Sequence, residues 1–180
     1  MEQPGSSSGS MDTKLKADIA ESAVVTELLK RGLKVLNPVG DRLPYDLALD
    51  LNGKLIRIQV KSAWFNTKTK SYGVDVRRTK TNRRRMLRAR YEKDDFDFAI
   101  LYIDSLRVFY VMPFSVFSSY ASTVSLIETD KRQRKPKSAE YRERWDLLSD
   151  GLLKPKRLKD NLSNSVEPFK IKTGQYRAKP

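Results

Sequence analysis

The stretch PYDLALDLNGKLIRIQVKSA, residues 44–63, constrains the fold of this chain more than any other segment. Asn52-Gly53 lies in its middle, and both residues tolerate the positive φ angles of a type I′ turn, so the stretch predicts a β-hairpin with a two-residue loop. A loop of that length also fixes the register of the two strands, which places Leu47 opposite Ile58 on an apolar face.

Polar residues converge at the open end of this predicted hairpin, on its other face. The same register places Asp46 opposite Gln59, and Lys61 lies two residues further along on the same side. A hard cation accepts a carboxylate, an amide oxygen and a backbone carbonyl such as that of Val60, and a nearby lysine can stabilise charge on a phosphate. These residues therefore allow a metal-dependent phosphodiesterase site, although an ordinary solvated sheet face fits the same spacing.

Glu21 is the second acidic candidate because its surroundings favour burial. Residues 12–31 predict a helix, with Asp12 or Thr13 as N-cap and Gly32 as the residue that ends it. The segment around Glu21, AESAVV, is otherwise small and apolar, and a lone buried carboxylate is costly unless it is paired or bound to a metal. A carboxylate at the edge of the buried stripe of the helix is the alternative.

Net charge and two missing residue types narrow the function. The chain has 36 Lys and Arg against 22 Asp and Glu, a net charge of +14, which favours a nucleic acid as partner over a membrane surface. The absence of Cys and His excludes thiolate and imidazole catalysis, so an active site would use carboxylates, amides, Lys or Arg, and a hard metal ion. No apolar run approaches the roughly 20 residues of a membrane span, and no secretory signal is visible, so we expect a cytoplasmic protein.

Two basic segments, residues 77–93 and 131–137, are the candidate DNA contacts. Their Lys and Arg side chains can follow phosphates while Arg and Asn read base edges, whereas a solvated or disordered basic loop is the alternative. The candidate contacts are Arg77, Arg78, Lys80, Asn82, Arg83, Arg84, Arg85, Arg88, Lys131 and Arg132.

The remaining patterns predict one α/β (α+β) domain, with a mixed central β-sheet and flanking helices. Trp64 and Phe65 are expected to pack in its core. Residues 1–10 predict a disordered leader, residues 11–153 the folded domain and residues 154–180 a basic tail. Further elements are expected as strands at 33–36, 72–76, 96–104, 107–112 and 124–127, and as helices from Pro113 to Tyr120 and over 138–149, the last ended by Gly151.

Together these residues resemble the core of PD-(D/E)xK nucleases. The matching features are Glu21 on the first helix, Pro-x-Asp at 44–46, a short hairpin, and x-x-Lys at 59–61. From about residue 11 to 63 the chain resembles more closely the PD-(D/E)xK group I intron homing endonucleases of cyanobacterial type, which have Gln where other members have an acid. The resemblance extends to roughly residue 160 and implies a restriction-endonuclease-like core.

The resemblance also implies roles for the site residues. Asp46 would be the central metal ligand, Glu21 a supporting ligand, Gln59 the occupant of the second acidic position and Lys61 the catalytic lysine. Family members cut double-stranded DNA with Mg²⁺, for which Mn²⁺ can substitute, and leave 5′-phosphate and 3′-hydroxyl ends. Because one chain supplies one site, we expect at least a homodimer on a pseudo-palindromic target, and the resemblance implies a dimer of dimers.

Gln59 departs from the general family pattern. An amide in place of a carboxylate removes one negative charge, which should weaken cation binding or change the number of metal ions, and it leaves open an inactive descendant. Two other functions also fit the sequence: a Holliday-junction resolvase or restriction-type nuclease, and a basic nucleic-acid-binding protein without catalysis.

Overall fold

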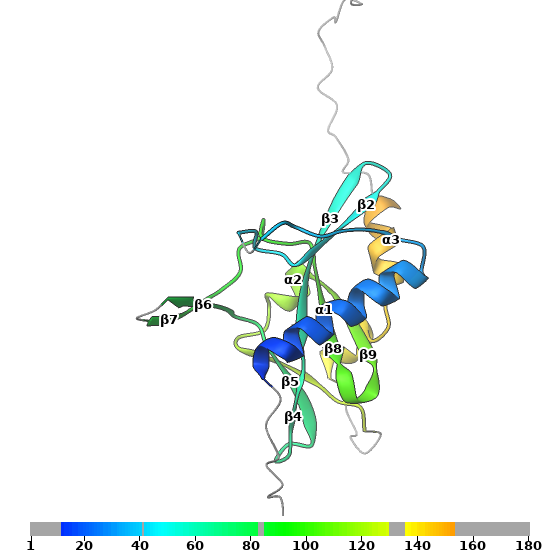
Figure 1. Cartoon of the computed structure of the whole chain (residues 1–180). Helices are drawn as coiled ribbons and strands as arrows, with labels where there is room; N and C mark the ends of the chain where they lie inside the picture. Colours follow the sequence, from blue (N-terminus) through cyan, green and yellow to red (C-terminus); the bar gives the residue numbers. More distant parts are fainter. Residues whose placement is uncertain (1–11, 41, 83–84, 130–135, 154–180) are drawn as a thin grey trace, which may run out of the picture.

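A computed structural model describes residues 12–40, 42–82, 85–129 and 136–153, which form a domain around a five-stranded mixed sheet (Figure 1). The order of strands in this sheet is β1-β2-β3-β8-β9; a second sheet has the order β10-β5-β4, and β6 pairs with β7 alone. The elements are α1 (Thr13–Lys30), β1 (Lys34–Leu36), β2 (Leu47–Leu51), β3 (Lys54–Ser62), β4 (Trp64–Asn66), β5 (Ser71–Asp75), β6 (Arg78–Asn82), β7 (Arg85–Ala89), β8 (Phe98–Ile103), η1 (Asp104–Leu106), β9 (Val108–Pro113), α2 (Phe114–Phe117), β10 (Thr123–Leu126), η2 (Lys137–Tyr141) and α3 (Asp146–Leu153).

The first helix confirms the sequence-based prediction. The Asp12 side chain caps α1 by accepting a hydrogen bond of 3.1 Å from the backbone N–H of Lys14. Gly32 follows the helix with φ +74°, a left-handed conformation that favours glycine at a helix C-terminus. One face of α1 is buried against the five-stranded sheet through Ala20, Val24 and Leu28.

The hairpin of β2 and β3 has the predicted turn and register. Asn52 and Gly53 have φ angles of 53° and 82°, as a type I′ turn requires, and Leu47 lies opposite Ile58. On its other side β3 runs parallel to β8, so it occupies the centre of the sheet. A central strand is held on both edges by hydrogen bonds, so its backbone, and the points from which its side chains project, are fixed.

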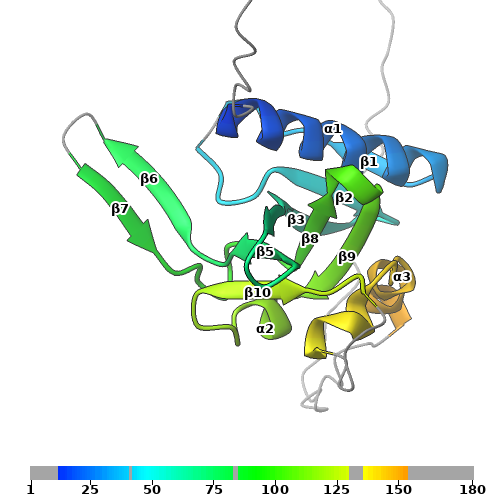
Figure 2. The same cartoon turned by 90° about the horizontal axis from the view of Figure 1, so that it is seen from below.

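Strand β8 separates two hydrophobic cores, because its successive side chains point to opposite faces. Ile100 belongs to the core beneath α1, whereas Leu101 belongs to the core formed with β5, β10 and α2. Figure 2 shows this layering, with α1 over one face of the five-stranded sheet and β10 and α2 at the other.

None of the helices in these described ranges is long and apolar enough to cross a membrane.

The predicted helix over 138–149 is wrong. The chain instead forms the short η2, and then Glu143 adopts φ 52° before α3 begins. The reason is tertiary: Glu143 exchanges backbone and side-chain hydrogen bonds with Phe109 at 2.9 and 2.8 Å, and its carboxylate accepts another from the indole of Trp145 at 2.7 Å. These contacts interrupt the helix early, and Gly151 lies inside α3 rather than ending it.

The expected burial of Trp64 and Phe65 is also wrong, since 44% and 53% of their surfaces are exposed. Both residues lie in β4, the edge strand of the small second sheet, where little covers them. The Trp64 ring does cover Gly73, where an added Cβ would lie 2.8 Å from the indole. The Trp64 ring is thus packed against the backbone of β5 although part of it faces solvent.

The first basic segment contains a second hairpin rather than a disordered loop. Strands β6 and β7 pair in antiparallel register, with Arg78 opposite Ala89 and Asn82 opposite Arg85. The hairpin extends away from the body of the domain (Figure 1). Residues 1–10, 131–135 and 154–180 lie outside the described residues, so the predictions made for them stay predictions.

Candidate active site

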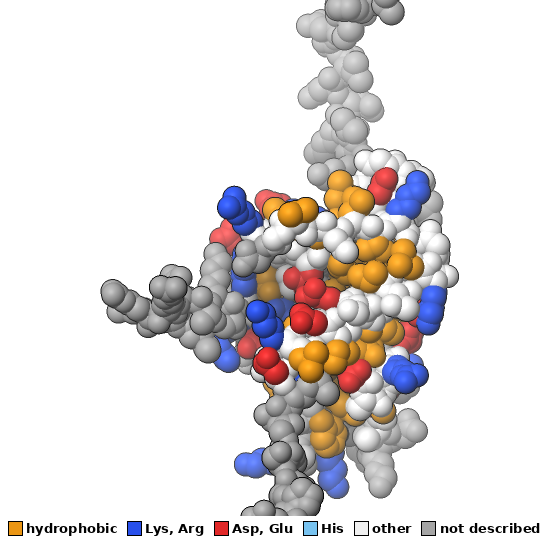
Figure 3. Space-filling view, viewed as in Figure 1, with side chains coloured by type: hydrophobic (Ala, Val, Ile, Leu, Met, Phe, Trp, Pro, Cys, Tyr) orange, Lys and Arg blue, Asp and Glu red, His pale blue; other side chains and the backbone are white. Residues whose placement is uncertain are grey.

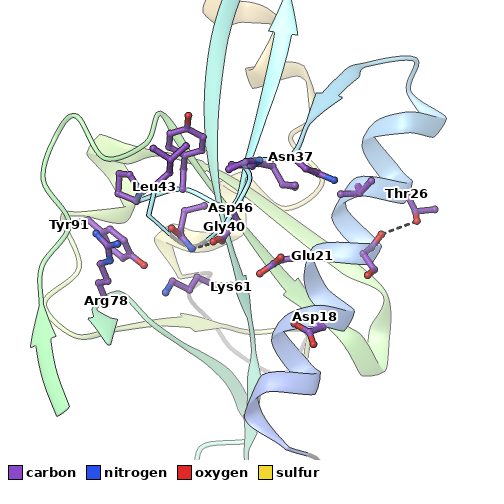
Figure 4. A pocket seen from close by; sticks show the side chains of 17 residues that line it. Asp18, Glu21, Thr26, Asn37, Gly40, Leu43, Asp46, Lys61, Arg78 and Tyr91 are labelled. Atoms are coloured by element: carbon purple, nitrogen blue, oxygen red, sulfur yellow. Dashed lines mark hydrogen bonds between the residues drawn. The ribbon is translucent and has the colours of Figure 1, made fainter. Parts of the chain in front are cut away.

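A cleft of about 920 Å³ brings together all four predicted catalytic residues. Glu21 reaches it from α1, Asp46 from the loop that enters β2, and Gln59 and Lys61 from β3. Figure 4 shows Asp46, Glu21 and Lys61 facing one another across this space. The helix carboxylate and the hairpin residues were predicted to meet, and they do.

Backbone and side-chain hydrogen bonds fix the position of Asp46. Its backbone N–H donates to the carbonyl of Ile58 at 2.9 Å, which extends the β2–β3 ladder beyond the end of β2. One carboxylate oxygen accepts from the backbone N–H of Val60 at 2.7 Å and also from the side-chain amide of Gln59. The other carboxylate oxygen takes part in neither bond and is left for a ligand.

Gln59 is almost fully buried beside Asp46, with 7% of its surface exposed. Its amide nitrogen donates to the carboxylate of Asp46 and, at 3.3 Å, to the carbonyl of Val60. To offer its oxygen to a cation shared with Asp46, this amide has to rotate by half a turn, which exchanges its donor and acceptor.

Burial makes the charge of each acidic residue unfavourable. Burial raises the pKa of Glu21, and the nearby carboxylates of Asp46 and Asp18 raise it further. Burial also raises the pKa of Asp46, partly offset by the hydrogen bond from Val60 and by the charge of Lys61. A divalent cation bound between these two carboxylates would reduce the repulsion between their negative charges.

Burial also makes the positive charge of Lys61 unfavourable. Burial lowers its pKa, Asp46 and Asp75 oppose that change, and Arg78 adds to it. A partly buried ammonium group in a cleft is suited to a phosphate, which would supply the negative charge that the surroundings lack.

The donor set fits a hard cation. The carboxylates of Glu21 and Asp46 and the amide of Gln59 line the cleft, and the carbonyl of Val60 lies beside that amide. All four would offer oxygen atoms, which suit Mg²⁺ better than softer metals. Within the described ranges, no three or more Asp, Glu, His or Cys side chains gather as a metal-binding group.

Among the other residues that line the cleft are Arg78 and Tyr91, which the sequence did not single out for it. Arg78, predicted as a DNA contact, faces the cleft from the start of β6, and Tyr91 faces it from the segment after β7. No local sequence pattern indicates this placement, which follows from the pairing of β6 with β7 that brings the two ends of the basic segment together.

The structure describes the side chains of only some of the other predicted DNA contacts. Arg88 is exposed and lies 3.7 Å from the carboxylate of Asp75, while the backbone N–H of Arg77 donates to the same side chain at 2.8 Å. On the face drawn in Figure 3, acidic side chains gather at the centre and Lys and Arg lie beside them toward the hairpin. The structure describes the backbone but not the side chains of three predicted contacts in β6 and β7, namely Lys80, Asn82 and Arg85. Four others lie wholly outside the described residues: Arg83, Arg84, Lys131 and Arg132.

The sequence and fold of this chain are similar to those of known endonucleases. A model of the family described as PD-(D/E)XK endonuclease matches residues 11–148. The solved structure of a bacterial homing endonuclease, I-Ssp6803I, is 53% identical, aligns with a TM-score of 0.74, and the match covers 79% of this chain and 97% of that one. No curated protein matches the sequence.

Proposed function

This chain belongs to the PD-(D/E)XK endonuclease family and is a DNA endonuclease, and we propose that it is a Mg²⁺-dependent, site-specific homing endonuclease of an intron. It cuts both strands of a pseudo-palindromic duplex and leaves 5′-phosphate and 3′-hydroxyl ends. Its place of action is the cytoplasm. Residues 11–153 form the catalytic domain.

One observation supports this proposal above the others. Glu21, Asp46, Gln59 and Lys61, which are spread over 41 sequence positions, line a single cleft next to a basic hairpin. A non-catalytic DNA-binding protein has no need to keep two mutually repelling carboxylates and a lysine with a lowered pKa partly buried, because such burial costs stability.

The protein's own residues have distinct tasks in this mechanism. Asp46 and Glu21 would hold the cation, with Gln59 and the carbonyl of Val60 as further ligands. When bound, Mg²⁺ makes water more acidic and neutralises charge that develops on the phosphate; Mn²⁺, a cation of similar preferences, can replace it. Lys61 stabilises the same charge as an ammonium group, or it accepts a proton from the attacking water, a task that its lowered pKa favours.

The basic hairpin supplies the affinity for DNA. Its Lys and Arg residues contact phosphates, and Asn82 and arginines in β6 and β7 read base edges. Because a duplex has two strands and each chain has one cleft, the active form is at least a dimer, and a dimer of dimers would match a long target. Residues 131–137 and 154–180 add contacts to the DNA backbone.

The experiment that tests this function can be run while the target sequence is still unknown. The protein is incubated with a library of random duplexes and Mg²⁺, and the new DNA ends are sequenced. We expect cuts at one sequence, no cuts with a chelator present, and loss of cleavage by on the order of 10³-fold in Lys61→Ala with DNA affinity retained. Lys54→Ala, at the exposed opposite end of the same strand, is the control and should cut like the parent.

Three results would contradict the proposal. Binding without Mg²⁺-dependent nicking by the parent would favour a non-catalytic DNA-binding protein. Preference for four-way junctions over linear duplexes would favour a resolvase. A Lys61→Ala variant that cuts at the parent's rate would remove the active site assigned to this cleft.

A further inference from the structure

The ammonium group of Lys61 lies over the aromatic ring of Tyr91, with its nitrogen 5.1 Å from the ring centroid. A cation at this distance from the face of an aromatic ring is attracted by the negative charge density of that face, more strongly where water is excluded. None of the ion pairs within the described ranges includes Lys61. The ring is therefore its direct electrostatic partner in the cleft.

The ring of Tyr91 is itself held in a fixed position. Its centroid lies 5.0 Å from that of Phe96 in an edge-to-face arrangement, and 6.4 Å from that of Phe117. Both phenylalanines are fully buried in the core beneath β5 and β10, with exposed fractions of 0% and 1%. Tyr91 thus has one side anchored in a close-packed core while it also lines the cleft beside Lys61.

A lysine in such a site needs a support of this kind. Its four-carbon side chain is flexible, and the carboxylates of Asp46 and Asp75 both attract its charge. An ammonium drawn onto Asp46 would compete with the cation for the same carboxylate and would leave the phosphate without its counter-charge. An aromatic face attracts the ammonium without neutralising it, so the positive charge stays available.

We propose that Tyr91 is a positioning residue whose ring face holds the Lys61 ammonium group away from Asp46 and toward the scissile phosphate. This inference rests on the proposed function of Lys61 in DNA cleavage. It assigns to Tyr91 no contact with DNA and no proton transfer, so the phenol hydroxyl is dispensable and the ring is not.

The test compares variants of the full chain at position 91 on the duplex that the parent cuts. Tyr91→Phe keeps the ring and should cut within about threefold of the parent, whereas Tyr91→Leu should lower the single-turnover rate constant by roughly 10- to 100-fold because the ammonium is misplaced. DNA affinity should change by no more than about twofold, since neither side chain carries charge. Tyr72→Leu, which removes an aromatic ring from β5 away from Lys61, is the matched control and should leave the rate unchanged.

Phenylalanine analogues with one, two and three fluorine atoms at position 91 provide a measurement that a purely structural role would not affect. Fluorine withdraws electrons from the ring face with little change in ring size, so the logarithm of the cleavage rate should fall steadily with each added atom. Thermal unfolding confirms that each variant is folded, and the fluorinated series remains informative if Tyr91→Leu is not.

Equal cleavage rates across the fluorinated series, or a folded Tyr91→Leu variant that cuts like the parent, would overturn the inference and leave the proposed function standing. A parent protein that cuts no duplex would overturn the proposed function, and this inference with it. The two failures are therefore distinguishable.

Discussion

The cleft and the basic hairpin are both charged, but their charges are in different physical situations. In the cleft, Glu21, Asp46 and Lys61 are partly buried, and burial is the largest influence on each pKa. In the hairpin, Arg88 has 57% of its side chain exposed, and its nearest carboxylate, on Asp75, is 3.7 Å away.

This difference predicts how each region responds to mutation. Charges in a medium of low polarity act strongly and are screened little by salt, whereas exposed charges act weakly and are screened within about 10 Å at ordinary ionic strength. A single change in the cleft should therefore alter the chemistry, while a single change in the hairpin should alter affinity by a small amount that depends on salt.

Arg78 tests the boundary between the two regions, and its replacement should have the largest effect among changes in the hairpin. It belongs to the hairpin by sequence, yet it lines the cleft and acts on the pKa of Asp46 and of Lys61. We expect Arg78→Ala to lower the single-turnover cleavage rate by on the order of 10²-fold, the loss typical of a group that stabilises charge in a transition state. Arg88→Ala, a change of the same charge at the other strand of the hairpin, should keep the rate within about threefold at saturating protein.

Rate and affinity measured together decide the outcome. If Arg78→Ala weakens binding but cuts at the parent's rate once DNA is saturated, Arg78 belongs with the hairpin and not with the cleft. If both variants lose cleavage to the same extent, burial does not separate the two regions.

Exchanging an amide for a carboxylate in each region compares them directly. Gln59→Glu adds a negative charge beside Asp46 and removes the hydrogen bond that the Gln59 amide donates to it. We expect the Mg²⁺ concentration for half-maximal cleavage to fall by roughly 10-fold, equivalent to about 1.4 kcal/mol of cation binding. The metal-free protein should melt at a lower temperature because two buried carboxylates then repel each other.

Asn82→Asp is the matched control, since it makes the same chemical change in the hairpin. It should weaken DNA binding and leave the Mg²⁺ requirement unchanged. A Gln59→Glu variant with an unaltered Mg²⁺ midpoint would show that position 59 is not a ligand.

That Glu21, Asp46, Gln59 and Lys61 share one cleft could be predicted from sequence because local chemistry determines their positions. The Asn52-Gly53 turn sets the register that places Asp46 beside Gln59, and the apolar surroundings of Glu21 indicate the face of α1 that packs on the sheet. Each of these inferences needs only neighbouring residues and one packing contact.

The features that sequence did not predict depend on distant contacts. Glu143 interrupts the predicted last helix because it bonds to Phe109 on β9, and no local pattern indicates that partner. Trp64 is exposed because β4 lies at a sheet edge, which is a property of topology rather than composition. Tyr91 faces Lys61 across 30 positions of sequence, so its role depends on how the hairpin is rooted.

Replacing the Asp46 carboxylate should have a smaller effect, on the stability of the metal-free protein, and this effect should depend on pH. Because burial raises the pKa of Asp46 in the folded protein, proton uptake stabilises the fold fully below the unfolded pKa, near 4, and this contribution is lost as the pH rises through the folded pKa. Asp46→Asn removes the buried charge, and its remaining oxygen can accept the hydrogen bonds from Val60 and Gln59.

We therefore expect Asp46→Asn to be more stable than the parent at pH 8 in a chelator, by on the order of 1 kcal/mol or a few degrees in melting temperature. The gain should shrink as the pH falls toward 4. Calorimetry across this range checks it, and Asp50→Asn, in the turn of the same hairpin, is the control. A gain that is constant with pH would mean that the charge of Asp46 is not what burial penalises.

The smallest effect should come from a single arginine between β6 and β7. Arg84→Ala removes one proposed contact to a phosphate, so affinity should fall only a few-fold near physiological salt, and the slope of log affinity against log salt should decrease by about one unit. Cleavage at saturating protein should not change. Arg84→Lys keeps the charge and should keep the slope, which separates a phosphate contact from recognition of a base.

This small change is informative because it tests only whether the hairpin binds DNA through phosphates, independently of the chemistry in the cleft. If the parent's affinity proves insensitive to salt, the hairpin does not bind DNA through phosphates, and its positive charge would need another partner than the DNA backbone. If Arg84→Lys instead changes the preferred sequence at one position while the slope holds, Arg84 reads a base edge. Specificity would then depend on the segment that joins β6 to β7, and catalysis on the buried cleft at the root of the same hairpin.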